Sequence, residues 1–100
     1  MEDRKKQYIY IVKPVKENFE KTATEEDNKI VSEHFLYLKN LLEEKKLILA
    51  GPQVNAKFGI VVFEADSEKE AEYIMQNDPA VINGVFSAEL FPFRVSLLRT

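Results

Sequence analysis

Two segments of this chain are apolar on both of their alternating faces, and this pattern limits the fold more than any other feature. Tyr8–Lys13 has the sequence YIYIVK and Phe58–Ala65 has the sequence FGIVVFEA. Their β-branched and aromatic residues predict strands. A strand of an antiparallel sheet with one wet face normally alternates between apolar and polar residues. Both faces of these two strands must therefore be covered.

The rest of the chain supplies two helices and two further strands. The apolar spacing predicts one helix from Thr22 or Thr24 to about Lys45 and another over Glu68–Gln76. The remaining predictions are a polar connection at 14–24, a strand at 47–50 broken by a bulge at Gly51-Pro52, and a strand at 85–98. The order β-α-β-β-α-β predicts an α+β, ferredoxin-like fold, in which two helices cover one face of a four-stranded antiparallel sheet.

Two helices on one face leave the other face of this sheet open. Tyr, Ile, Val and Phe side chains spread over that face would expose more apolar surface than a soluble monomer normally does. The simplest cover is a second copy of the chain, packed face to face. The sequence therefore predicts a homodimer through the open sheet face, a dimeric α/β barrel.

Length and composition restrict the remaining possibilities. The 100 residues predict a single domain over 1–100, and residues 1–6 are expected to form a disordered tail. A net charge of −3 argues against nucleic-acid binding, which requires a basic face. No apolar run is long enough for a membrane span, and the charged N-terminus lacks a signal peptide's apolar region. The expected location is the cytoplasm.

The chemistry of a metal or redox site is also missing from the sequence. The chain has no cysteine and one histidine, so neither a thiolate nucleophile nor a spaced set of metal ligands can be identified. It also lacks the glycine-rich phosphate-binding motifs of nucleotide-binding proteins. We therefore expect no metal and no cofactor.

Three motifs, taken in order, resemble the YciI-like (YCII-related) proteins of the dimeric α/β-barrel superfamily. They are the histidine in SEHFLYLKNLLEEKKL, the AGP triplet in LILAGPQV, and the Asp-Pro and later Gly in NDPAVINGVFSAELFPF. The resemblance covers the chain from Tyr8 to Leu98. It implies the fold and the dimer predicted above.

The resemblance also implies a site. In that family a histidine and the aspartate of the Asp-Pro face one pocket between the helices and the sheet, which here would be His34 and Asp78. Relatives often carry an arginine three residues before the histidine, where this chain has Val31. Better-understood members of the superfamily isomerise lactones, remove halide from ring compounds or oxidise aromatic substrates without a cofactor.

The residues themselves leave alternatives open at both positions. His34 is the one side chain that titrates near neutral pH, which suits a general acid or base. The helical spacing places Phe35 and Leu38 on the core stripe, with His34 on its shoulder, so a half-covered structural histidine is the alternative. Asp78 could orient the imidazole, or could simply cap a helix that begins at Pro79.

Four further residues are candidates for contacts with a ligand. Gly51 and Pro52 break a strand near the expected pocket, so that their backbone groups could touch a ligand. Tyr10 belongs to an aromatic set that mostly builds the core, although one or two members could line a pocket for a ring compound. Arg94 would pair with a carboxylate of the protein or of a ligand.

Two functions are consistent with these features. The first is a cofactor-independent enzyme in which His34 and Asp78 transfer a proton in an isomerisation or elimination of a small organic substrate. The second is a non-catalytic dimeric domain that binds a small metabolite or only self-associates. The two differ in whether His34 and Asp78 meet at hydrogen-bond distance beside an open cavity.

Overall fold

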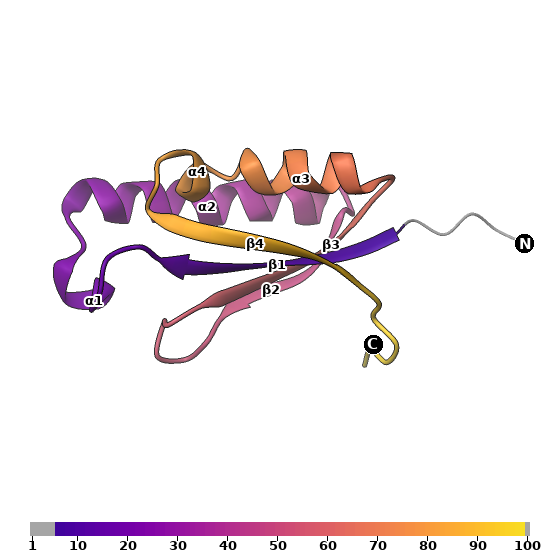
Figure 1. Ribbon diagram of the computed structural model, residues 1–100, viewed down its shortest axis with the longest axis horizontal. Helices are drawn as coiled ribbons and strands as arrows, with labels where there is room; N and C mark the ends of the chain where they lie inside the picture. The colour runs from indigo at the N-terminus through magenta and orange to yellow at the C-terminus, as the bar shows by residue number, and fades with distance from the viewer. Residues whose placement is uncertain (1–5, 100) are drawn as a thin grey trace, which may run out of the picture.

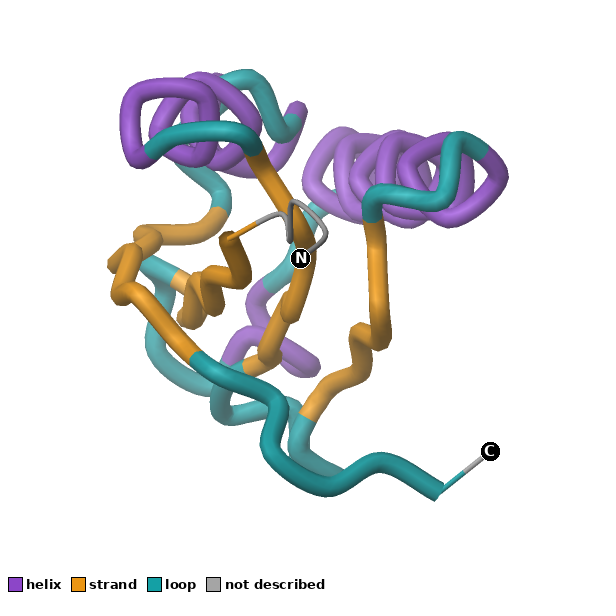
Figure 2. Tube along the Cα trace, turned by 90° about the vertical axis from the view of Figure 1, so that its right-hand side faces the viewer, coloured by secondary structure: helices purple, strands orange, loops and turns teal. Residues whose placement is uncertain are grey.

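The computed structural model describes residues 6–99, which form one four-stranded antiparallel sheet with the helices between residues 25 and 82 on one face (Figures 1 and 2). The strand order is β2-β3-β1-β4, as in a ferredoxin-like fold. In chain order, the elements are β1 (Lys6–Pro14), α1 (Phe19–Thr22), α2 (Glu25–Glu43), β2 (Leu47–Pro52), β3 (Gly59–Ala65), α3 (Glu68–Gln76), α4 (Pro79–Ile82) and β4 (Phe86–Phe93).

The two central strands place their aromatic residues against the helices. Tyr8 pairs with Phe63 and Tyr10 pairs with Val61 across the β1–β3 register. These four side chains are buried, and they form the centre of the main core with residues of α2 and α3. Because side chains alternate along a strand, this register fixes which residues point to the open face.

Helix α2 begins at Thr24, one of the two predicted positions. The Thr24 side chain accepts a hydrogen bond from the backbone N–H of Asp27, and the Asp27 carboxylate accepts one from the Thr24 N–H. This reciprocal pair satisfies two of the free donors at the start of the helix. The buried positions of α2 are Ile30, Leu38 and Leu41.

Phe35 is not part of the core stripe of α2, as its spacing had suggested. Its side chain is 65% exposed, whereas Leu38 is buried. The buried positions Ile30 and Leu38 lie four residues before and after His34, so the inward-facing side of the helix is centred on the histidine. His34 therefore lies on the inner face rather than on its shoulder, and Phe35 is turned toward solvent.

The sequence Asn77-Asp78-Pro79 separates α3 from α4. Asn77 is the C-cap of α3, and Asp78 is the N-cap of α4, with Pro79 in the first turn. A proline fits there because its missing N–H would have no partner inside the helix. After α4 the chain reverses at Gly84, whose φ of 71° has little cost only for a residue without a side chain.

Several boundaries differ from the sequence predictions. The polar connection at 14–24 contains the short helix α1, and β4 ends at Phe93 rather than at 98. Strand β2 continues through Gly51 to Pro52, which the sheet tolerates because β2 is an edge strand. Its irregularity lies between Leu47 and Leu49 instead of at Gly51-Pro52. Of the predicted disordered tail, Lys6 begins β1 and the other five residues lie outside the described part of the chain.

The open face of the sheet is mainly apolar, as the two-sided strand pattern predicts. Ile9 pairs with Val62 and Ile11 pairs with Ile60 on this face, away from the helices. Leu49, Phe91 and Phe93 extend the same apolar surface onto the edge strands and are partly exposed. The second copy that would cover this face stays a prediction. Within residues 6–99, none of the helices has the length and hydropathy of a membrane span.

Candidate active site

Asp78 is a fully buried carboxylate at the start of α4. It accepts hydrogen bonds from the Tyr10 hydroxyl at 2.7 Å and from the backbone N–H of Ala80 at 3.0 Å. The Nδ1 atom of His34 lies 2.8 Å from its Oδ1 and 2.7 Å from its Oδ2. A buried carboxylate is costly unless such partners surround it, and here three different elements supply them.

This arrangement determines how His34 can act. A carboxylate only accepts hydrogen bonds, so it favours the form of the ring with its proton on Nδ1. The other ring nitrogen, Nε2, is then left with a free electron pair, and no residue within 6–99 forms a hydrogen bond to it. The side chain is 14% exposed, and its ring packs edge to face on Phe86 with centroids 5.3 Å apart. His34 is therefore held in one orientation with one nitrogen available as a base.

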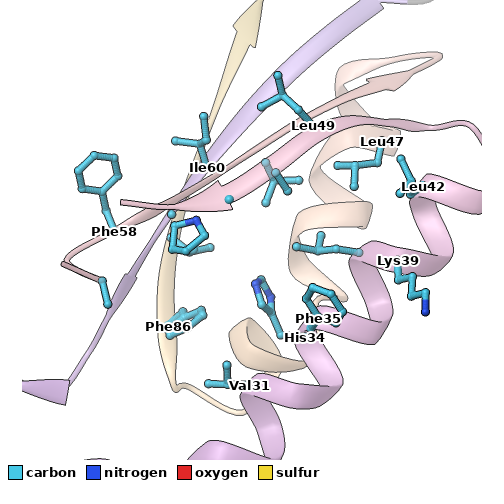
Figure 3. Close-up of a pocket in the computed structure, with 18 of the residues that line it drawn as sticks. Val31, His34, Phe35, Lys39, Leu42, Leu47, Leu49, Phe58, Ile60 and Phe86 are labelled. Atoms are coloured by element: carbon cyan, nitrogen blue, oxygen red, sulfur yellow. The ribbon is translucent and has the colours of Figure 1, made fainter. Parts of the chain in front are cut away.

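His34 forms part of the wall of a cavity between α2 and the β2–β3 edge of the sheet (Figure 3). The cavity has a volume of about 730 Å³, and most of the side chains around it are aliphatic or aromatic. Its titratable side chains are those of His34 and Lys39. Figure 3 shows Leu49 and Ile60 on the far side of the strands from His34, so the hollow continues around β2 to the open face.

The predicted site residues are distributed unequally around this cavity. Gly51 and Pro52 line it together with His34, and Val31 also contributes to its wall. Tyr10 is fully buried and is not part of the wall, because its hydroxyl is turned toward Asp78. Arg94 is exposed just after β4, beside a different hollow. The structure thus brings the Tyr10 hydroxyl to Asp78 from the buried core, whereas Arg94 lies outside this cavity.

Sequence reasoning missed two features of this site. The first is the contact between Tyr10 and Asp78, which are 68 positions apart and meet only when β1 packs under α4. The second is the exposed part of the cavity wall, here called the cavity mouth, which includes the side chains of Phe35 and Leu42. A usable signal existed for the second, since both residues lie just beside the buried positions of α2.

Residues 6–99 contain no cluster of three or more His, Asp or Glu side chains that could hold a metal.

Two tyrosine hydroxyls near Asp78 are kept neutral by their surroundings. Burial raises the pKa of Tyr10 far above its usual value, and the adjacent Asp78 carboxylate raises it further. Burial, with a smaller contribution from Asp78, raises the pKa of Tyr37 to about 12, and its hydroxyl donates to the backbone oxygen of Ile74 at 2.7 Å. Both groups therefore act as hydrogen-bond donors rather than as acids or bases at neutral pH.

These pKa shifts predict how the folded protein responds to alkali. An unfolded tyrosine ionises near pH 10, so a raised pKa in the folded state stabilises the fold fully below that pH. We expect the free energy of unfolding to fall as the pH rises from about 10 to about 12, as Tyr37 ionises. Urea unfolding at several pH values measures this loss.

Phenolate absorbance in folded protein provides the control for this pH prediction. Tyr37→Phe should remove the absorbance change near pH 12, whereas Tyr73→Phe, at an exposed position, should leave it in place. Ionisation of all the tyrosines together near pH 10, while circular dichroism still shows a folded chain, would contradict the prediction.

The sequence of this chain is similar to one protein family and to one curated protein. The sequence profile of the YCII-related domain family matches residues 7–94. The uncharacterized protein YjpA of Bacillus subtilis is 43% identical over 60 residues, which cover 60% of this chain and 68% of that protein.

Two solved structures have a similar fold. One is 5-chloro-2-hydroxyhydroquinone dehydrochlorinase from Burkholderia phenoliruptrix in complex with 2,5-dihydroxybenzoquinone, with a TM-score of 0.65 and 18% identity. The match covers 87% of this chain and 93% of that chain. The other is an uncharacterized protein from Thermotoga maritima, with a TM-score of 0.50 and 16% identity over 91% of this chain and 100% of that chain. At these identities the likeness establishes the fold.

Proposed function

We propose that this chain, which belongs to the YCII-related domain family, catalyses a cofactor-independent proton transfer on a small organic molecule. The observation that carries this proposal is the contact between His34 and Asp78 beside an open apolar cavity. A base oriented by a carboxylate, with its second nitrogen free, is the usual arrangement for general acid–base catalysis.

The proposed reaction begins with His34. Its Nε2 takes a proton from a carbon next to a carbonyl, or from a hydroxyl conjugated with one, and the bonding electrons move to the carbonyl oxygen. The imidazolium that forms is stabilised by the Asp78 carboxylate at Nδ1. The electrons then return from the carbonyl oxygen. In an isomerisation His34 gives the proton to another carbon. In an elimination a leaving group departs with the electron pair and takes the proton from His34, which regenerates the neutral imidazole.

The cavity favours a compact substrate that is mainly apolar. Its volume of about 730 Å³ is in the range of sites for small molecules, and its walls offer few polar groups. The Burkholderia protein acts, by its name, on a chlorinated hydroxyhydroquinone, and its structure contains a dihydroxybenzoquinone. Hydroxylated ring compounds of this size are therefore the first substrate class to test.

Tyr10 has a supporting part in this proposal. Its hydroxyl donates to Oδ2 of Asp78, the same oxygen that lies 2.7 Å from Nδ1 of His34. With the Ala80 N–H as the third donor, Asp78 has little freedom to rotate away from the imidazole. Tyr10 thus fixes the carboxylate, and the carboxylate fixes His34, without any contact between Tyr10 and the substrate.

A homodimer through the open sheet face is part of the same proposal. The apolar surface around Ile9, Ile11 and Phe91 supports it, because a soluble monomer rarely exposes a whole apolar sheet face. A second copy would also cover Leu49 and Ile60, which border the cavity. Sedimentation of the wild-type protein at micromolar concentration tests this part, since a pure monomer would contradict it.

One observation favours a non-catalytic binding function instead. Val31 lines the cavity where an ionisable side chain could have reached the ligand. Among residues 6–99, Lys39 is the one lysine or arginine in the cavity wall. A site with little charge to stabilise a developing oxyanion could bind a metabolite without converting it.

The deciding experiment is a thermal-shift and turnover screen of hydroxylated, chlorinated and quinone ring compounds on wild type and on His34→Gln. We expect compounds that stabilise the wild type to be converted by it and not by the variant. A ligand present at 100 times its dissociation constant should stabilise the protein by about 2.7 kcal/mol. Stabilisation without conversion by either protein would support the binding function, and equal stabilisation with equal conversion would remove His34 from the site.

A further inference from the structure

The C-terminal arm, defined here as Arg94–Arg99 with the sequence RVSLLR, follows β4 without joining any helix or strand. Its leucines are strongly exposed, Leu97 at 94% and Leu98 at 55%. Figures 1 and 2 show the arm leaving the end of β4 on the side of the sheet opposite the helices. Adjacent exposed leucines on the open-face side of the molecule require a partner surface.

The arm is attached to β1 at its root. Its root is fixed by one hydrogen bond, from the backbone N–H of Val95 to Oε1 of Gln7 at 2.7 Å. A hollow of about 700 Å³ lies beside that root, between it and the first residues of β1. The root is therefore attached, whereas the two leucines near the end of the arm are open to solvent.

The charges of the arm complement those of the open face. Arg94 and Arg99 are cationic, and neither has a carboxylate partner among residues 6–99. Glu64 and Glu89 point to the open face, because they pair with Gln7 and Ile11 of β1, and they have no cationic partner in the same part of the chain. An apolar, cationic segment and an apolar face with two free carboxylates match in both respects.

We propose that the C-terminal arm clasps a second copy of this chain, with its leucines on the apolar open face of that copy and its arginines near Glu64 and Glu89. This inference rests on the proposed dimer and adds to it the segment that holds it together. Six extended residues span about 20 Å, whereas two packed sheets lie about 10 Å apart, so the arm can reach across. In a two-fold dimer each copy gives one arm and receives one, so every arm contact occurs twice.

Sedimentation equilibrium on an arm variant tests the apolar part. We expect Leu97→Asp with Leu98→Asp to raise the dimer dissociation constant at least 30-fold. The matched control is Val54→Asp with Tyr73→Asp, which adds the same charge at exposed positions away from the arm, 97% and 67% exposed. The control should change the constant less than threefold. An arm variant that dimerises as well as the control would overturn the proposal.

A charge exchange tests the partner of the arm. Arg94→Glu with Arg99→Glu in one chain, and Glu64→Lys with Glu89→Lys in another, should each weaken the homodimer. Mixing the two chains should restore association as a heterodimer, because both of its arm contacts then join opposite charges, whereas each homodimer places like charges together. No gain on mixing would overturn the proposed pairing.

The outcomes also separate this inference from the proposed function. A wild-type chain that is monomeric at every concentration would contradict both the proposed arm contact and the proposed dimer. The turnover screen would still test proton transfer by His34. A stable dimer that ignores the arm substitutions overturns the arm alone.

Discussion

Replacing Asp78 with alanine is expected to lower the free energy of unfolding by about 3–5 kcal/mol. The substitution removes the shared acceptor of the Tyr10 hydroxyl, the Ala80 N–H and the His34 ring. The Tyr10 hydroxyl and the Ala80 N–H are buried, so they cannot regain a partner from water without opening the structure. Urea unfolding measures the loss, and the melting temperature should fall by more than about 10 °C.

Two further variants make this prediction decisive. Asp78→Asn should be less destabilising than Asp78→Ala, because the asparagine oxygen can still accept hydrogen bonds. It should still destabilise the fold, because its NH₂ group faces other donors. Asp27→Ala, at the partly exposed capping box of α2, should have a smaller effect, because solvent can replace its hydrogen bonds. If Asp78→Ala were no more destabilising than Asp27→Ala, the carboxylate would not have the structural importance that its three contacts indicate.

Replacing His34 with glutamine should lower kcat/KM about 10²- to 10⁴-fold on whichever ring compound the screen identifies. Glutamine has a similar reach and can donate to Asp78, but it offers no nitrogen that accepts a proton at neutral pH. Most of the loss should appear in kcat, since the apolar walls that bind the substrate are unchanged. Steady-state kinetics of the two purified proteins measures it.

A control shows whether the loss is specific to the imidazole. Phe35→Leu changes the neighbouring side chain at the cavity mouth, which is 65% exposed, and should affect KM more than kcat. The urea unfolding curve of His34→Gln should resemble that of the wild type. A variant that is stable and retains full kcat would show that His34 is not the base.

Much of the fold was predictable because its signals are local and repeated. The two-sided apolar pattern of β1 and β3, the spacing of α2 and the Asn77-Asp78-Pro79 break each need only a few neighbouring residues. The errors fell where local patterns compete. The connection before α2 contains helix α1, and β4 stops at Phe93 even though apolar residues continue into the arm, because pairing partners rather than composition end a strand.

The site was predictable only in part. The resemblance to a family singled out His34 and Asp78, and the structure brings them together. The spacing of Ile30, His34 and Leu38 at four-residue intervals could have placed the histidine on the inner face, but Phe35 obscured it. The role of Tyr10 depends on the register of β1 and the packing of α4, and neither is written in any short stretch of sequence.

The position of Asp78 at the first turn of α4 has a consequence for how relatives of this chain should be compared. The same carboxylate caps that helix and orients the imidazole, so its loss would damage folding before it affected any reaction. A relative that had given up catalysis would still be selected to keep this aspartate. Under the proposed function, the residue that distinguishes catalytic from non-catalytic relatives is therefore the histidine, whose removal leaves the cap intact.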